Sequence, residues 1–255
     1  MTVIAIFNQK GGVGKTTTAV NLAAALARGE RTTYGIDLDP QAHLSAIAGV
    51  TAASGDDTIL SLFQRDRPLR ELVCQSPSKI RLIPSHLELS KVDTMFGKGY
   101  DVVNRLNASL RAERLSEDGA NVVIDCSPMI GVLSLNAIFA SDCVLVPVSA
   151  DHLSYKGALQ IEKTLKALEP VLKRRVKRRY VLTRFDAGRR VEREVRRMLE
   201  EHFGDEVCRT HITESTSLAE CPAYNKTVFE HAPKSRGARD YVALLEELLA
   251  DRFIG

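Results

Sequence analysis

The sequence predicts an α/β fold in which one doubly wound, mostly parallel sheet carries helices on both faces. Short apolar segments alternate with segments of helical spacing along most of the 255 residues. A glycine-rich turn separates the first apolar segment from the first helical one, and acidic residues end two later apolar segments. Because open α/β sheets bind ligands at the carboxyl ends of their strands, these residues belong to the predicted site.

The predicted strands are short apolar runs bounded by polar or turn-forming residues, at 3–7, 31–36, 80–84, 121–125, 143–147, 179–183 and 207–209. Helical spacing predicts helices at 18–28, 58–63, 101–115, 154–172, 190–203 and 235–251. Gly204 is the expected C-cap of the helix at 190–203, and a polar loop is expected at 212–220. No repeat or low-complexity linker interrupts the pattern, so one domain over residues 1–255 is expected.

Composition indicates an ordinary globular protein, with 44% hydrophobic and 26% charged residues and a net charge of +3. No apolar run approaches the length of a membrane span, and the N-terminus lacks the features of a signal peptide. The five cysteines are far apart and form no CxxC pair, which indicates neither disulfides nor zinc. We therefore expect a cytoplasmic protein.

The turn after the first strand has the composition of a phosphate-binding loop. Consecutive backbone N–H groups and a helix N-terminus can point at one anion there, and a lysine adds a full charge. The usual pattern has glycine where Gln9 stands, and a second lysine lies inside the loop. The predicted nucleotide contacts in this loop are Lys10, Gly11, Gly12, Val13, Gly14, Lys15, Thr16 and Thr17. Lys15 is the candidate phosphate ligand, and Thr16 the candidate Mg²⁺ ligand.

Acidic residues end two of the predicted strands. Asp37 and Asp39 follow the strand at 31–36, and Asp125 ends the strand at 121–125. An aspartate at the end of a strand near a phosphate loop can approach Mg²⁺, usually through water. These carboxylates therefore extend the predicted site beyond the loop.

Basic residues concentrate in two adjacent segments. Six of the seven residues in 173–179 are Lys or Arg. The next segment carries the candidate DNA contacts Arg184, Arg189, Arg190, Arg193, Arg196 and Arg197. One interpretation is a solvated helix face on which Glu192 and Glu194 act as intrahelical partners. The other is a surface that binds nucleic acid, and the clustering favours it.

Residues 10–17, 37–41 and 122–125 together resemble the deviant Walker A ATPases of the ParA/MinD family. The similarity to the chromosome- and plasmid-partitioning branch, ParA/Soj, covers nearly the whole sequence. It includes Ser-Leu-Asn-Ala at 134–137, Val-Leu-Val-Pro at 144–147, Thr-Arg-Phe-Asp at 183–186 and the segment 233–241.

The resemblance implies a homodimer formed with ATP and Mg²⁺. In this family Lys15 binds the phosphates in its own subunit, whereas Lys10 reaches across a two-fold interface to the ATP of the partner. Asp39 orients or activates the attacking water and lies near the metal. Thr16 binds Mg²⁺ directly and Asp125 through water, with Asp37 as an alternative on the metal side. Further nucleotide contacts are expected at Thr183, Arg184 and Thr213. Hydrolysis should be slow until a partner stimulates it.

The partitioning branch also implies non-specific DNA binding in the ATP state, association with the nucleoid, and a ParB-like or other cargo adaptor that stimulates hydrolysis. Relatives often have an arginine where Gly188 stands, a proline at Thr213 and an arginine at Ser217. We therefore expect any DNA contact to concentrate at residues 184–197. Few residues precede Lys10, so an operator-binding N-terminal domain is not expected. The cargo could be a chromosome, a plasmid, a chemotaxis cluster or a microcompartment.

Two alternatives are a membrane-cycling branch of the family and a metabolic relative with the same ATPase fold. A MinD-like, membrane-cycling protein needs a basic amphipathic C-terminal helix, but the charges at 241–255 are mostly Glu246, Glu247 and Asp251, which anionic lipid repels. No membrane binding is expected. An iron–sulfur reductase or cluster carrier needs cysteines placed to share a cluster, whereas Cys126 and Cys143 belong to predicted strands and are interpreted as buried.

Overall fold

The computed structural model describes residues 2–29, 31–97, 99–113, 115 and 119–255. Across these residues one sheet of eight strands has the order β3-β4-β2-β5-β1-β6-β7-β8. Its strands are β1 (Thr2–Ile6), β2 (Thr33–Leu38), β3 (Cys74–Gln75), β4 (Arg81–Ile83), β5 (Asn121–Cys126), β6 (Cys143–Ser149), β7 (Lys177–Phe185) and β8 (Ile212–Thr213). Only the pair of β3 and β4 is antiparallel among the described strand pairs. The predicted doubly wound, mostly parallel sheet is confirmed.

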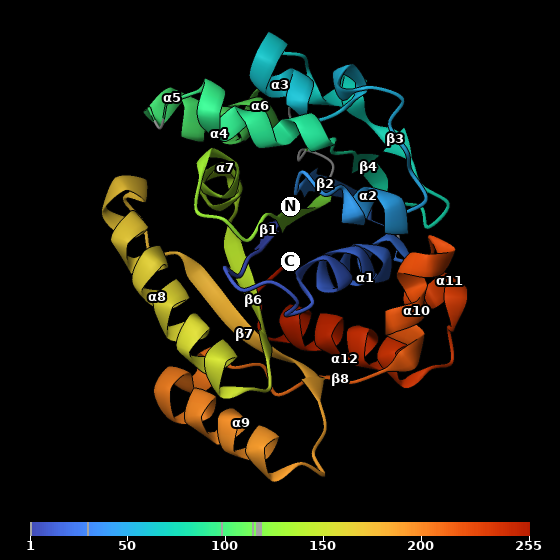
Figure 1. Cartoon of the computed structure of the whole chain (residues 1–255), viewed down its shortest axis with the longest axis vertical. Coiled ribbons are helices and arrows are strands. Elements are labelled where there is room, and N and C mark those ends of the chain that lie inside the picture. The colour runs from blue at the N-terminus through green and yellow to red at the C-terminus, as the bar shows by residue number, and fades with distance from the viewer. Residues whose placement is uncertain (1, 30, 98, 114, 116–118) are drawn as a thin grey trace.

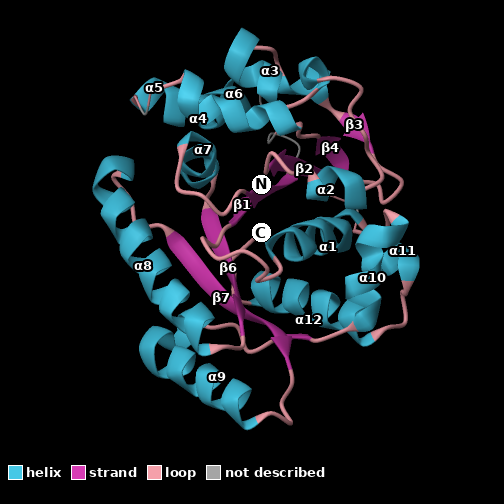
Figure 2. Ribbon diagram, in the orientation of Figure 1, coloured by secondary structure: helices cyan, strands magenta, loops and turns pink. Residues whose placement is uncertain are grey.

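Helices cover both faces of the sheet (Figures 1 and 2). One face packs against α1 (Lys15–Ala27), α2 (His43–Ile47), α10 (Thr216–Tyr224), α11 (Val228–His231) and α12 (Arg236–Ala250). The other packs against α3 (Leu60–Arg65), α4 (Val92–Met95), α5 (Tyr100–Val103), α6 (Arg105–Ala112), α7 (Val132–Ala140), α8 (His152–Leu172) and α9 (Arg190–Phe203). Short 3₁₀ helices lie at Gly55–Asp57, Leu69–Leu72, Leu87–Lys91 and Gly204–Glu206.

The central strands are buried on both faces. In β1, Ile4 and Ile6 belong to the core under α1, whereas Val3 and Ala5 belong to the core on the opposite face. Successive side chains of a strand point to opposite faces, and here both faces are covered by helices. Strands of this kind therefore appear in the sequence as continuous apolar runs.

The closing region differs from the prediction. Residues 207–209 contribute only a bridge between Val207 and Tyr180, and β8 forms further on. The predicted polar loop at 212–220 is wrong, because β8 and the start of α10 occupy it. Both are short and owe their formation to tertiary contacts: Ile212 and Leu218 are buried in the core around α1.

Other helical regions also differ, and the short helices α2, α4 and α11 were not predicted. The helix predicted at 101–115 divides into α5 and α6 at Asn104, and Arg114 lies outside the described residues. Helix α7 was not predicted, because it is buried nearly all round and therefore lacks a polar face. By contrast, α9 and its C-cap Gly204 have the predicted bounds.

Gly35 in β2 provides a test of the packing between strand and core. A Cβ at this position would lie 2.9 Å from Leu82 Cδ1 and 3.1 Å from Ile80 Cγ2. Gly35→Ala should therefore lower the free energy of unfolding by about 1–3 kcal/mol through overpacking, measured by urea denaturation. Gly157→Ala is the control, since a Cβ there meets nothing within 4 Å and alanine favours a helix. Equal stability of the two variants would contradict this close packing around Gly35.

Candidate nucleotide site

The phosphate loop lies between β1 and α1. Gly12 and Gly14 have φ angles of 75° and 82°, in the left-handed region that glycine adopts without steric cost. Gly14 is the N-cap of α1, so the loop runs directly into the positive end of a long helix. The backbone geometry is therefore that of an anion-binding turn.

Lys15 is the first residue of α1 and is buried. Its ammonium donates a hydrogen bond to the carbonyl oxygen of Lys10 at 3.0 Å, so the side chain folds back along the loop. Burial lowers the pKa of this ammonium, while the carboxylates of Asp125 and Asp39 act in the opposite direction. The loop thus holds a buried cation that has no bonded carboxylate among the described residues.

Asp125 is fully buried, and neither of its carboxylate oxygens has a hydrogen-bond partner in the described part of the chain. Strand register places it beside Ile6 of β1 and Asp37 of β2. Burial raises the pKa of this carboxyl well above its ordinary value, and Asp37 adds to the effect. The hydroxyl of Thr16 and the charge of Lys15 act in the opposite direction. A buried, unpaired carboxyl near a hydroxyl is a donor set that suits Mg²⁺.

Asp37 and Asp39 have different environments. Asp37 is buried, and its two oxygens accept from the Asp39 N–H at 3.1 Å, the Ser45 N–H at 2.9 Å and the Ser45 hydroxyl at 2.7 Å. Burial raises the pKa of Asp37 to about 6, although these hydrogen bonds act to lower it. Asp37 therefore stabilises the turn after β2. Both of its oxygens already accept hydrogen bonds, so neither is left for a metal.

Asp39 directly follows β2 and is partly exposed. One oxygen accepts the N–H of Gln41 at 3.0 Å. Its charge acts on both Lys15 and Asp125. Of the two acidic residues after β2, Asp39 is thus the one available for a ligand or a water molecule.

Lys10 binds to α8 rather than to its own phosphate loop. Its ammonium lies 2.9 and 3.1 Å from the two Asp151 oxygens and 2.8 Å from the Ser154 hydroxyl. Asp151 is the N-cap of α8 and also accepts the N–H of Ser154. The sequence analysis missed Asp151 and Ser154, although an aspartate three residues before a serine at a strand end is a recognisable helix start.

A cavity of about 270 Å³ adjoins the loop at Gly14 and Thr17. Thr183, Arg184 and Thr213 all line it, so the structure brings these three predicted nucleotide contacts together. Thr183 donates its hydroxyl to the Val13 carbonyl at 2.9 Å, and Arg184 has a φ of 53° at the irregularity between β7 and β8. The lining residues that the sequence analysis missed come from β8, the segment after it, α10 and α12: Ile212, Glu214, Ser215, Leu218, Ala219 and Tyr241.

Some of the basic residues in 184–197 form salt bridges with carboxylates, and others do not. Arg189 lies 3.3 Å from Asp186, 3.1 Å from Glu192 and 3.2 Å from Glu214, measured between side-chain nitrogen and oxygen. On α9, Arg196 and Arg197 pair with the glutamates four residues further on. Arg184, Arg190 and Arg193 are exposed and make no salt bridge among the described residues.

The basic run at 173–179 binds largely to the protein itself. Arg178 is buried and pairs with Glu169 at 2.7 Å, and Arg179 pairs with Asp251 at 2.9 Å. The other contacts of the run are Arg174 with the Ser141 carbonyl, Arg175 with Glu206, and Lys177 with the carbonyls of Arg252 and Phe253. These bonds attach β7 and the segment before it to α8, to the C-terminal segment and to Ser141 and Glu206. Clustering in the sequence therefore overstated the basic surface.

The cysteines give no support to a metal-cluster site. Cys126 and Cys143 are free and buried, and burial raises the pKa of the Cys143 thiol to about 12. No group of three or more His, Cys, Asp or Glu side chains suited to a metal occurs in the part of the chain that the structure describes.

A glycine-rich loop between β1 and α1, with an unpaired aspartate ending the adjacent parallel strand, defines the class of P-loop nucleotide-binding proteins. A family model described as an AAA domain matches residues 1–178. The chain is 33% identical over 255 residues to the chromosome partitioning protein ParA of Myxococcus xanthus, covering 97% of this chain and 87% of that protein. It is 37% identical over 249 residues to the chromosome-partitioning ATPase Soj of Thermus thermophilus, covering 97% and 95%. The chain therefore belongs to the ParA/Soj family of partitioning ATPases.

Solved structures agree on the fold. The chain matches cobyrinic acid a,c-diamide synthase from Mycobacterium smegmatis, solved with a bound ATP analog and magnesium, with a TM-score of 0.84 and 25% identity. That match covers 99% of this chain and 96% of the synthase. Apo McdA from Cyanothece matches with a TM-score of 0.86 and 22% identity over 98% of this chain and 99% of McdA, which shows the fold alone.

Because the Asp125 carboxyl is unpaired, replacing it should raise the stability of the nucleotide-free protein but weaken the binding of Mg-ATP. Asp125→Asn removes a carboxyl whose ionisation is opposed by burial, so the nucleotide-free protein in EDTA should become more stable by about 1 kcal/mol at neutral pH, measured by urea denaturation. The extra thermal stability that Mg-ATP confers on the wild-type chain should shrink in the same variant. Asp142→Asn, at the far end of β6, is the control for the second effect. Destabilisation of the nucleotide-free variant would contradict the unpaired state of Asp125.

Proposed function

We propose that this chain is an ATP-driven positioning switch, in which two copies assemble around ATP and separate after hydrolysis to ADP and phosphate. Membership of the ParA/Soj family and the ATP-analog and magnesium complex of the Mycobacterium smegmatis synthase support an ATPase that uses ATP and Mg²⁺. The observation that carries the two-copy arrangement is the placement of Lys10, whose ammonium is bound to Asp151 and Ser154 while Lys15 occupies the loop.

The residues of one copy divide the binding task. The loop N–H groups and Lys15 bind the phosphates, and the Thr16 hydroxyl with Asp125 would hold Mg²⁺. When bound, the ion neutralises charge on the phosphate oxygens. Asp39 orients the attacking water from the turn after β2. The cavity lined by Thr183, Arg184 and Thr213 receives the sugar and base. A lone carboxylate is a weak base for water, so the isolated protein should turn over slowly.

Lys10 completes the site in trans. The ion pair between Lys10 and Asp151 is partly exposed, with side-chain exposures of 34% and 47%. Pairs of this kind contribute at most about 1 kcal/mol, whereas a triphosphate offers several charged acceptors. ATP in a partner copy can therefore displace Asp151 and draw Lys10 across the interface. There it would stabilise the charge that develops during phosphoryl transfer.

Non-specific DNA binding in the ATP state rests on Arg184, Arg190 and Arg193, which are exposed and form no salt bridge among the described residues. The Arg193 guanidinium also donates to the Ala187 carbonyl at 2.6 Å. Arg189, Arg196 and Arg197 belong to the same surface, but each already has a carboxylate partner. Phosphate contacts suffice for sequence-independent binding. We place the protein in the cytoplasm on the nucleoid, where a ParB-like or other cargo adaptor stimulates hydrolysis.

The membrane-cycling alternative finds no support in the terminal helix. The apolar side of α12 is used internally, because Tyr241, Leu244 and Leu248 are buried in the core. Phe253 and Ile254 after the helix are buried as well. Among the described helices, none combines the length and apolarity required to cross a bilayer.

Sedimentation with different nucleotides tests the switch. The wild-type chain should sediment as a dimer with Mg-ATP and as a monomer with ADP or without nucleotide. Lys10→Ala should still bind ATP but lose the stable dimer, or hydrolyse ATP at least about 10²-fold more slowly, because a trans cation is missing. Lys166→Ala, an exposed lysine on α8, is the control and should match the wild type. One mass under all nucleotide conditions would refute the switch.

Binding to random-sequence DNA in Mg-ATP tests the DNA surface. Replacing Arg190 and Arg193 by Gln should weaken binding and reduce the slope of log K against log salt by about 1 for each arginine that no longer neutralises a DNA phosphate. Replacing Arg174 and Arg175 by Gln removes equal charge from the basic run, whose side chains already bind the protein, and should change binding less. If the two double variants reduce affinity equally, net charge rather than the α9 surface governs binding.

A further inference from the structure

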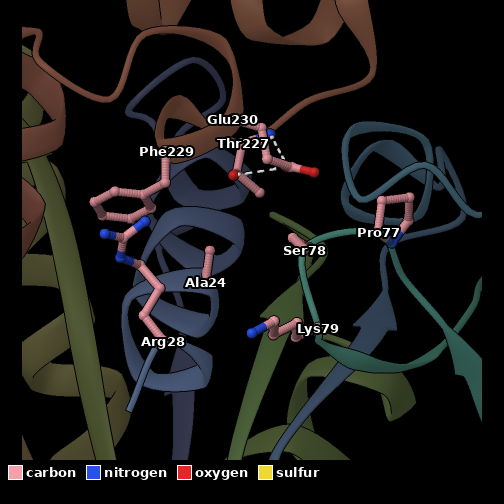
Figure 3. A pocket seen from close by; sticks show the side chains of 8 residues that line it. All are labelled: Ala24, Arg28, Pro77, Ser78, Lys79, Thr227, Phe229 and Glu230. Carbon is pink, nitrogen blue, oxygen red and sulfur yellow. Dashed lines mark hydrogen bonds between the residues drawn. The ribbon is translucent and has the colours of Figure 1, made fainter.

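A second cavity, of about 400 Å³, lies at the opposite end of α1 from the phosphate loop (Figure 3). Its walls come from three segments that are far apart in the sequence. They are the last turns of α1 with Ala24 and Arg28, the β3–β4 turn with Ser78 and Lys79, and the start of α11 with Thr227 and Phe229. None of these residues lines the cavity beside Gly14 and Thr17. The proposed ATPase cycle leaves this cavity without a role.

Two of the residues that line this cavity, Arg28 and Lys79, are cations that form no salt bridge among the described residues. The Arg28 guanidinium lies 5.0 Å from the centre of the Phe229 ring, and Figure 3 shows the Lys79 ammonium directed toward the α1 wall. The lining also contains Glu230, but one of its oxygens already accepts the N–H and hydroxyl of Thr227 at 2.9 and 2.8 Å. Unpaired cations beside hydroxyls and an aromatic ring favour an anionic ligand. The volume is that of a small-molecule site rather than of a single ion.

Lys79 is held in place by the turn. Its φ of 65° lies in the left-handed region, where glycine is the usual residue of a hairpin turn. Its N–H bonds to the Ser76 carbonyl at 2.9 Å, and the Ser76 hydroxyl bonds to the Ala48 carbonyl at 2.6 Å. The chain thus places a lysine, at a conformational cost, where an uncharged glycine would fit the backbone better.

A buried side chain connects this cavity to the phosphate loop. Asn21 of α1 is fully buried; its amide nitrogen donates to the Thr17 carbonyl at 2.8 Å, and its oxygen accepts the Val228 N–H at 2.8 Å. Thr17 belongs to the nucleotide site, and Val228 lies between two residues that line the second cavity. One amide therefore joins the wall of each cavity, and neither wall can shift without changing a buried hydrogen bond.

We propose that the second cavity is a regulatory site for a small molecule carrying a carboxylate or phosphate group, bound by Arg28 and Lys79. A ligand held between α1 and the start of α11 changes the position of Val228, and Asn21 passes that change to Thr17. Ligand and nucleotide then alter each other's affinity by the same factor, as linkage requires. This coupling is a property of one copy of the chain and depends on neither the dimer nor DNA.

Binding is tested on the full chain saturated with Mg-ADP, so that the phosphate loop is filled. Succinate and inorganic phosphate, each titrated at constant ionic strength, should shift the amide NMR signals of Lys79 and Glu230 saturably. The probe with the lower dissociation constant identifies the preferred anion. Arg28→Gln with Lys79→Gln should weaken binding at least about tenfold, since both charged donors are removed. Arg31→Gln with Lys156→Gln removes the same charge elsewhere and should bind like the wild type.

The coupling is tested by calorimetric titration of ADP with and without a saturating concentration of the better probe. The dissociation constant of ADP should change at least about fivefold in the wild type and in the charge control, but not in the double variant. Lys79→Gly is a second variant that should fold well, because glycine suits the turn, and it should also bind the probe weakly. Unsaturable shifts equal to those caused by chloride, or undiminished binding in both variants, would overturn the site. An unchanged ADP affinity at saturation would overturn the regulatory role.

Discussion

The proposed nucleotide site depends on the buried carboxyl of Asp125. Its two oxygens are shielded from water and have no hydrogen-bond partner in the described chain. They lie there because β5 pairs in parallel with both β1 and β2, which aligns Asp125 with the strand before the phosphate loop and with Asp37. Burying a carboxyl without a hydrogen-bond partner costs folding free energy, and a bound group can compensate that cost. The core around β5 keeps the carboxyl dry, so a cation held there interacts with it more strongly than it would in water.

The same parallel arrangement orders the remaining parts of the site along one edge of the sheet. From β2 through β5, β1, β6 and β7 to β8, the edge carries Asp39, Asp125, the loop, Asp151, Thr183 and Thr213. The residues of the proposed nucleotide site therefore lie in one row along this edge. Because β6 lies beside β1, Asp151 is within reach of Lys10. Lys10 is thus held within its own subunit, which is the starting state of the proposed switch.

Helix α1 connects two ends of the molecule that differ in chemistry. Its first turn belongs to the phosphate loop, and its last turn lines a cavity with unpaired cations. Asn21, midway between them, is satisfied only when Thr17 and Val228 are both in place. A rigid, buried helix with a polar bridge of this kind transmits small displacements, since a packed interior does not absorb them. The proposed regulation by a small anion would act through this helix.

The sequence by itself determined the sheet and the loop, and it predicted which residues form the nucleotide site. Buried parallel strands appear in the sequence as apolar runs. The loop requires glycine at Gly12 and Gly14 because their positive φ angles are a local steric constraint. Only the tertiary structure decided which charged side chains form salt bridges and which are exposed to solvent. Arg178 and Arg190 look alike in the sequence, yet one is buried against Glu169 and the other is exposed. Likewise, β8 and α10 form through contacts with distant core residues, and Asp151 meets Lys10 across 141 residues. Pairing and burial depend on neighbours that are remote in the chain, so local composition cannot specify them.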